Sequence, residues 1–288
     1  MGNHDRSRRE FVGGSAAAGL MAVAGTVAAA PPAVVEKDVQ VHTSDGDCDA
    51  AFFHPDKGAH PGVLLWTDIF GLRPAFREFG RRLAASGFAV LVPNPFYRSA
   101  KAPVFGDIST FNFQSETDRA RFPPLVAPLN AAGAVERDAH AYVEFLDAQP
   151  AVNRAKRLGV QGYCMSGPLM LRCAAAVPER FGAGASFHGG GLVTDKPDSA
   201  HLLIPKIKAQ LYIAIAANDD ARAPNDKNTL RAACAAARVR AEIEVYAGAQ
   251  HGWCVPDMPA QNGKAIYDKT AAERAWTHLL RLYRSALS

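Results

Sequence analysis

Short apolar runs alternate with helical segments along most of this chain, and this alternation constrains its fold more than any other feature. Residues 62–66 and 88–92 are continuous apolar runs, which is typical of strands buried on both faces of a sheet. Further strands are predicted at 39–42, 50–53, 158–162, 184–187, 210–216 and 242–246, and helices at 75–86, 134–148, 168–176, 225–236 and 270–286. The pattern predicts an α/β fold, with a mostly parallel central sheet and helices on both faces.

The composition indicates one globular domain over residues 31–288. Of the 288 residues, 48% are hydrophobic and 21% are charged, which excludes a disordered chain. The formal net charge is +4 and the basic residues form no blocks, so we expect no nucleic-acid partner. Residues 97–130 are rich in proline and aromatic side chains and are predicted to be irregular. A loop of this length in a compact domain is usually a lid or a substrate wall.

Residues 1–30 differ from the rest of the chain. The motif S-R-R-x-F-V at 7–12 precedes an uncharged run that is too short and too weakly hydrophobic for a membrane span. Two arginines before a mild apolar run are typical of an export signal rather than a buried helix. The pattern resembles the twin-arginine (Tat) signal. We therefore expect the Tat export machinery as a partner and a periplasmic mature protein that does not bind membranes.

The predicted strand at 158–162 leads into a turn around Cys164 and then into a helix. Such a turn is typical of a nucleophile elbow, which pushes one side chain out above the sheet and needs small residues two places before and after it. Gly162 and Ser166 meet this need around Cys164. Around Ser166 the corresponding residues are Cys164 and Pro168, and the proline does not fit. The sequence therefore predicts Cys164 as the nucleophile, with the helix N-terminus favouring its thiolate.

A thiol nucleophile needs a base that is oriented by a carboxylate. Asp219 and Asp220 follow the predicted strand at 210–216, and His251 follows the one at 242–246. Because ligands of open α/β sheets bind at the carboxyl ends of the strands, these groups are expected to converge on Cys164. Either aspartate can be the acid on this argument.

Other strand ends supply further candidates for the site. His188 also follows a predicted strand, but it precedes the acid in sequence, so we interpret it as a wall of the substrate pocket rather than the base.

An oxyanion hole needs two backbone N–H groups that point inward. Met165 supplies one from the elbow, and Ile69, in the loop after the strand at 62–66, is the candidate for the second.

Three motifs together carry a specific resemblance: D-I-F-G-L at 68–72, G-Y-C-M-S-G at 162–167 and H-G-W at 251–253. In this order and spacing they resemble the dienelactone hydrolase family over nearly all of residues 40–288. The resemblance implies an α/β-hydrolase fold, a Cys–His–Asp triad and hydrolysis of lactones and esters. It assigns Cys164 and His251 to the triad and Ile69 and Met165 to the oxyanion hole. The strand length favours Asp219 as the acid and the spacing to Pro224 favours Asp220; we predict Asp219.

The sequence departs from the family pattern at two points in the predicted substrate pocket. Asp68 stands where the archetype has a glutamate that contacts the resting thiol, and its side chain is one methylene shorter. The archetype also has an arginine shortly after the histidine, which grips the substrate carboxylate, whereas residues 252–263 contain none. This segment offers Trp253 as an apolar wall instead. Arg119 and Arg121 are the nearby cations that could replace that arginine, and we predict that uncharged esters or lactones are turned over better than dienelactone.

The sequence thus predicts a monomeric hydrolase that cleaves small carboxylic esters or lactones through a thioester on Cys164, with no cofactor or metal. The alternative from a different class is a non-catalytic periplasmic binding protein on the same fold. The chain has five cysteines, so at least one thiol is unpaired. Cys254 lies three residues after His251 and could approach the elbow, which suggests a redox pair with Cys164 as a further alternative. We prefer to interpret Cys254 as a buried thiol that packs beside Trp253.

Overall fold

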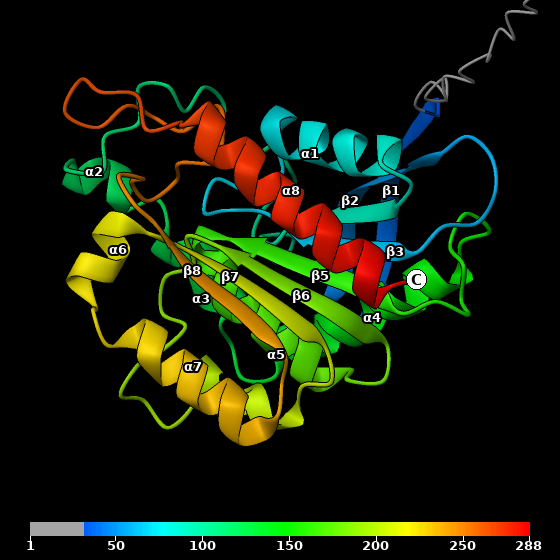
Figure 1. The fold of residues 1–288 in the computed structure, drawn as a ribbon. Coiled ribbons are helices and arrows are strands. Elements are labelled where there is room, and N and C mark those ends of the chain that lie inside the picture. Colours follow the sequence, from blue (N-terminus) through cyan, green and yellow to red (C-terminus); the bar gives the residue numbers. More distant parts are fainter. Residues whose placement is uncertain (1–31) are drawn as a thin grey trace, which may run out of the picture. The chain divides into compact units, whose positions relative to one another are not determined.

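The computed structural model describes residues 32–288, which form an eight-stranded sheet in the order β1-β2-β4-β3-β5-β6-β7-β8 (Figure 1). Strand β1 (Val34–Thr43) pairs antiparallel with β2 (Gly46–Pro55), which pairs antiparallel with β4 (Ala89–Pro93). All other neighbouring strands, from β4 to β8 in this order, pair in parallel. The strands that follow β4 in the sheet are β3 (Gly62–Trp66), β5 (Leu158–Tyr163), β6 (Phe181–Phe187), β7 (Gln210–Ala216) and β8 (Ala241–Tyr246). The predicted mostly parallel sheet is confirmed.

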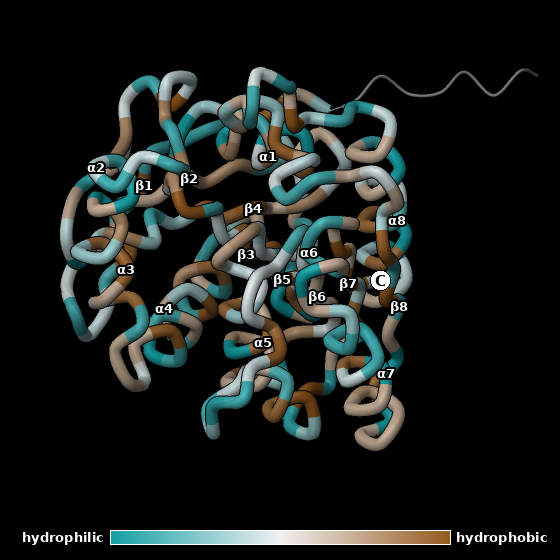
Figure 2. Tube along the Cα trace, turned by 90° about the vertical axis from the view of Figure 1, so that its left-hand side faces the viewer, coloured by the Kyte–Doolittle hydropathy of each residue, from teal (hydrophilic) through white to brown (hydrophobic). Residues whose placement is uncertain are grey.

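Helices cover both faces of the sheet, also as predicted (Figure 1). On one face lie α1 (Pro74–Ala85) and α8 (Lys269–Ala286), whose apolar side chains share a buried cluster with Val63, Leu65 and Val90. On the other face lie α4 (Ala134–Ala148), α5 (Gly167–Ala176) and α7 (Asp226–Ala237). Figure 2 shows hydrophobic stretches along the strands and hydrophilic stretches in the loops around them. The two cores hold the sheet rigid, so its strand ends are fixed points for a site.

The segment 97–130 is less irregular than predicted. It contains two short helices, α2 (Glu116–Arg119) and α3 (Pro123–Leu129). The Ser115 side chain caps α2 by accepting a hydrogen bond from the Asp118 N–H, and Pro123 and Pro124 stand in the first turn of α3, where proline is tolerated. Some of the prolines in this segment therefore stand at the start of a helix and not in a loop.

A phenylalanine cluster fastens this segment to the loop after β3. Phe70 is fully buried and makes edge-to-face contacts with the rings of Phe105 and Phe111, 5.5 and 5.0 Å away between centroids. Phe113 and Phe122 pack on the same ring. Aromatic pairs of this kind each add about 0.5–1.5 kcal/mol beyond their buried area. The cluster fixes the segment above the carboxyl end of the sheet.

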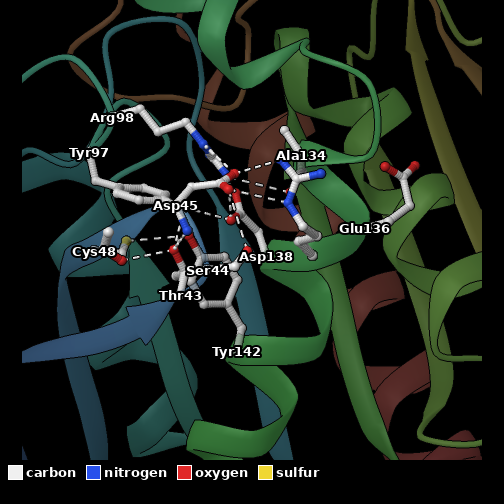
Figure 3. Close-up of polar contacts among 12 residues, drawn as sticks. Thr43, Ser44, Asp45, Cys48, Tyr97, Arg98, Ala134, Glu136, Asp138 and Tyr142 are labelled. Carbon is white, nitrogen blue, oxygen red and sulfur yellow. Dashed lines mark hydrogen bonds and ion pairs between the residues drawn. The ribbon is translucent and has the colours of Figure 1, made fainter.

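A polar cluster on the other side of the segment ties it to the first hairpin and to α4 (Figure 3). Arg98 donates hydrogen bonds to the carboxylates of Asp45 and Asp138, with shortest distances of 2.7 Å to each. Tyr97 donates to Asp138 at 2.8 Å, and Arg137 donates to Asp45 at 2.7 Å. Asp138 is buried, so removing Arg98 would leave an uncompensated charge at a cost of about 3–5 kcal/mol.

Two short helical segments between the later strands were absent from the prediction. The 3-10 helix η2 (Ala200–Lys206) and the helix α6 (Ala217–Arg222) each span fewer than eight residues, too few for a hydrophobic period to show. Helix α6 matters most, because Asp219 and Asp220 stand in its first turn.

The predicted export signal at 1–30 lies outside the described residues. Within residues 32–288, no helix is both long and apolar enough to span a membrane.

Candidate active site

The loops after β3, β5, β6, β7 and β8 leave the sheet at the same edge, since these strands are parallel. Cys164 comes directly after β5, and His188 directly after β6. Asp219 lies in α6, which begins immediately after β7, and His251 lies in the loop after β8. The strands thus place residues that are far apart in the sequence at one edge of the sheet.

Cys164 occupies a strained turn between β5 and α5. Its backbone has a φ of 55°, in the left-handed region that side chains other than glycine rarely adopt. The turn folds the chain tightly on itself: a Cβ on Gly162 would lie 2.0 Å from the carbonyl oxygen of Ser166. Only glycine fits at 162, which is the physical reason for the small residue that the elbow requires. The thiol of Cys164 is partly exposed, as a nucleophile must be.

Ser166, the alternative nucleophile, points away from the site. Its hydroxyl is fully buried and donates a hydrogen bond to the carbonyl of Thr67. It therefore stabilises the close approach of the elbow to the loop after β3.

His251 makes hydrogen bonds with two groups through its two ring nitrogens. Its Nδ1 lies 2.7 Å from Oδ2 of Asp219, and its Nε2 lies 3.1 Å from Sγ of Cys164. Its backbone N–H donates to Oδ1 of Asn218 at 2.8 Å, which fixes the loop against α6. Asp220 instead pairs with Lys227 at 2.7 Å. Of the two aspartates, Asp219 is the one that contacts the histidine.

The protonation of His251 follows from these contacts. Burial opposes the charged form, but the hydrogen bonds to Asp219 and Cys164 outweigh it and raise the pKa of His251 to about 10. The imidazole accordingly carries two protons at neutral pH and faces the sulfur as a cation.

His188 lies beside His251, with the ring centroids 4.8 Å apart and the planes at 71°. Its backbone φ is 40°, and its N–H donates to the carbonyl of Ala214 at 2.8 Å. The ring is fully buried, and neither nitrogen has a hydrogen-bond partner among the described residues. Burial, with a smaller contribution from the charge of His251, holds the pKa of His188 well below its ordinary value. His188 is therefore neutral.

A cavity of about 360 Å³ opens directly on Cys164 and His251. Ile69 lines it, and the Ile69 N–H makes no hydrogen bond within residues 32–288. Met165 follows Cys164 in the 3-10 turn, where the first N–H groups have no acceptor within the helix. The cavity is also lined by Phe113 and Gln114 from the segment 97–130, and by Asn218, Arg222, Met258 and Gln261.

Several residues predicted for the pocket do not line this cavity. Asp68 is fully buried and forms an ion pair with Arg73 at 2.6 Å, so its carboxylate is directed to that guanidinium. Trp253 is also fully buried and stacks on Tyr246, with the ring centroids 4.4 Å apart.

The two arginines of segment 97–130 do not line the cavity either. Arg119 donates to the carbonyl of Phe113 at 2.9 Å, and the Arg121 guanidinium lies 4.5 Å from the centroid of the Phe105 ring. The cavity is lined instead by the arginine Arg222, which was not predicted from the sequence. It lies three residues after Asp219 on the short helix α6, which no hydrophobic period in the sequence indicated.

A second cavity of about 670 Å³ lies beside Arg73, Asp257 and Met258, and its lining does not include Cys164. Although it is larger, we assign the site to the smaller cavity, because that one contains the thiol and the imidazole.

Cys254 is buried and packs in the same apolar cluster as Trp253. All five cysteines are free thiols.

The parallel sheet, the sharp turn between β5 and α5 and the polar groups on the strand ends define an α/β hydrolase. The model of the dienelactone hydrolase family matches residues 48–287, and the chain belongs to this family. It is therefore a hydrolase of the ester or lactone type.

Two individual relatives and one solved structure are similar to this chain. The chain is 28% identical to a carboxymethylenebutenolidase of Rhodococcus opacus over 155 residues, which is 52% of this chain and 54% of the relative. It is 25% identical to the hydrolase tropI of Talaromyces stipitatus over 221 residues, 76% of this chain and 77% of the relative. The crystal structure of P91, a dienelactone hydrolase-like promiscuous phosphotriesterase from metagenomic libraries, superposes with a TM-score of 0.70 at 23% identity. The match covers 89% of this chain and all of P91.

Proposed function

We propose that this protein hydrolyses small esters or lactones through a thioester on Cys164, with His251 as the acid and base and Asp219 as the group that orients it. The observation that carries the proposal is the unbroken line of contacts from Asp219 through His251 to Cys164, at 2.7 and 3.1 Å. A nucleophile, a base and an orienting carboxylate within hydrogen-bond reach are the minimum arrangement for acyl transfer to a side chain.

In the first half of the reaction, the Cys164 thiolate attacks the carbonyl carbon and the carbonyl electron pair moves to oxygen. The tetrahedral intermediate then collapses, and the C–O bond to the alcohol breaks as His251 gives its Nε2 proton to the leaving oxygen. With a lactone, the released alcohol remains part of the acyl group. In the second half, His251 takes a proton from water, and the hydroxide displaces the acid from Cys164. The thiolate is thereby restored.

The negative oxygen of the tetrahedral intermediate needs hydrogen-bond donors that are already in place. The backbone N–H groups of Ile69 and Met165 are our candidates, because Ile69 lines the cavity at Cys164 and Met165 follows the nucleophile. One such donor is typically worth about 10²–10³ in kcat.

Asp219 keeps Nδ1 of His251 protonated, so that Nε2 faces the sulfur.

The substrate of this proposal is small and uncharged. A cavity of about 360 Å³ limits the size of the acyl group. Arg222, which lines this cavity, has a side chain that is 73% exposed. Exposed ion pairs contribute only about 0.2–1 kcal/mol, so Arg222 is a weak anchor for a substrate carboxylate.

We further propose export through the Tat pathway and a periplasmic mature protein. The support is the S-R-R-x-F-V motif before an uncharged run at 13–30.

The test of the hydrolytic proposal is a rapid-mixing experiment with an activated ester. The protein should release a burst of alcohol equal to the concentration of active sites, followed by slower turnover. Cys164→Ala should show neither phase, whereas Cys254→Ala, which alters a buried thiol outside the cavity, should keep both. A burst that survives Cys164→Ala would contradict the proposal.

A further inference from the structure

Three ligand-type side chains meet at one point beside the cavity. The Sγ of Cys164 and one ring nitrogen each of His188 and His251 all lie within 4.8 Å of one another. The proposed hydrolysis uses Cys164 and His251 but gives His188 no role. A fully buried imidazole whose nitrogens both lack partners is costly, because it has lost its hydrogen bonds to water without replacement.

We propose that Cys164, His188 and His251 form a binding site for a thiophilic divalent cation such as Zn²⁺, and that the bound ion reversibly blocks the nucleophile. Thiolate and neutral imidazole are the ligands that Zn²⁺ prefers, at about 2.3 and 2.0–2.1 Å. Small side-chain movements bring three atoms that lie within 4.8 Å of one another into reach of one ion. Two of the three ligands, Cys164 and His251, line the cavity, so an ion can reach them from that side. The binding of the ion does not depend on the proposed hydrolysis, whereas the block of the nucleophile rests on it.

The surroundings of the three groups suit this role. The His188 ring is fully buried, and neither of its nitrogens has a hydrogen-bond partner within residues 32–288. Its backbone φ of 40° is unusual for a residue with a side chain. Gly190, in the loop that follows it, donates its N–H to the carbonyl of Cys164 at 3.1 Å, which fastens the loop to the elbow. His188 is thereby held against the other two ligands.

Asp219 supplies the outer contact that metal-binding histidines usually have. It accepts a hydrogen bond from Nδ1 of His251, which leaves Nε2 as the atom that faces the ion. When Zn²⁺ binds, one Zn–S and two Zn–N bonds form, and the proton shared by Cys164 and His251 leaves to the solvent. The sulfur is then no longer available for attack on a carbonyl, and a chelator that removes the ion restores it.

The test uses the protein freed of metal by a chelator and titrated with Cd²⁺ alone. We expect one equivalent to produce the ultraviolet charge-transfer band of a cadmium thiolate, and Cys164→Ala to abolish it. His188→Asn should weaken binding at least about tenfold, because even the loss of an outer-shell partner costs 10–100-fold. Asparagine tolerates the positive φ at 188, so this variant removes the ligand without changing the backbone.

A matched control and a measurement without variants complete the test. Glu242→Gln alters the other group of ligand-type side chains in the described part of the chain, Glu242, Glu244 and His278, and should leave the band unchanged. X-ray absorption of the wild-type protein with one equivalent of Zn²⁺ should give one sulfur and two imidazole ligands. A band that persists in Cys164→Ala, unaltered affinity in His188→Asn, or a zinc shell with a single imidazole would overturn the inference. None of these readouts depends on turnover, so a failure here is distinguishable from a failure of the proposed function.

Discussion

The Nε2 atom of His251 lies 3.1 Å from the Sγ atom of Cys164, although 87 residues separate them in the chain. Strands β6 and β7 stand between the strands that carry these residues, so the sheet alone does not bring them together. The loop after β8 crosses back over β7, held by the bond from the Ala217 N–H to the Ala249 carbonyl at 2.9 Å and by the contact of His251 with Asn218. The position of the imidazole thus depends on the start of α6 as much as on its own strand.

The two neighbouring aspartates of α6 should respond differently to the same change. We expect Asp219→Asn to lower kcat by about 10⁴-fold, the size of effect that a misoriented imidazole has in Ser-His-Asp enzymes. Asp220→Asn should stay within a few-fold of wild type, because that carboxylate pairs with Lys227. Steady-state kinetics of both variants with one ester checks this. The assignment of the acid is wrong if Asp220→Asn shows the large loss and Asp219→Asn the small one.

Much of this site could be predicted from the sequence, because its chemistry follows strand ends. Cys164, Asp219 and His251 each come after a strand with a clear apolar pattern, and a parallel sheet brings such ends to one edge. Gly162 was predictable as well, since the elbow leaves no room for a Cβ.

The rest depends on contacts that a sequence pattern does not encode. Arg222 lines the cavity only because the residues after β7 form a short helix, and six residues are too few to show a helical period. Asp68 was predicted for the pocket, but Arg73, five residues later, takes its carboxylate into a buried ion pair. Loops place side chains through such pairings, whereas strands place them through a regular alternation.

Substrate charge should matter little at this site. We expect kcat/KM for an uncharged activated acetate ester to exceed that for dienelactone, after correction for the uncatalysed rates. Arg222→Ala should lower kcat/KM for dienelactone by less than about sixfold, which corresponds to the 1 kcal/mol upper limit of an exposed ion pair. Arg119→Ala is the matched control, since Arg119 does not line the cavity. A strong preference for the carboxylated lactone that Arg222→Ala removes would show that this arginine is a true anchor.

Acid should weaken the attachment of the segment 97–130 through Asp45. Hydrogen bonds from Arg137 and Arg98 lower the pKa of Asp45 from 3.8 to about 2 (Figure 3). A carboxylate with a lowered pKa stabilises the fold above its unfolded pKa, and this contribution is lost as the pH falls through the folded value. The difference in Tm between wild type and Asp45→Asn should therefore be largest above pH 3.8 and shrink towards pH 2.

The control for this measurement is Asp56→Asn, because the Asp56 side chain is exposed and makes no ion pair within residues 32–288. Its Tm should follow wild type at every pH. A gap between wild type and Asp45→Asn that stays constant down to pH 2 would contradict the role given to the charge of Asp45.

Export is testable independently of the fold. Arg8→Lys combined with Arg9→Lys should leave the protein unprocessed in the cytoplasm if the twin arginine is read as a signal. Immunoblots of periplasmic and cytoplasmic fractions measure this, with a Lys37→Arg variant as a control outside the motif. Normal periplasmic delivery of the double variant would remove the Tat proposal.

The central claim is that Cys164 carries the acyl group, and intact-protein mass spectrometry of the acid-quenched reaction tests it most directly. During turnover of an activated ester, we expect the mass of the protein to increase by one acyl group, which peptide mapping places on Cys164 and hydroxylamine removes. Burial raises the pKa values of Cys48, Cys173, Cys234 and Cys254, so these thiols should remain unmodified. Turnover with the acyl group on another residue, or undiminished turnover by Cys164→Ala, would contradict the account.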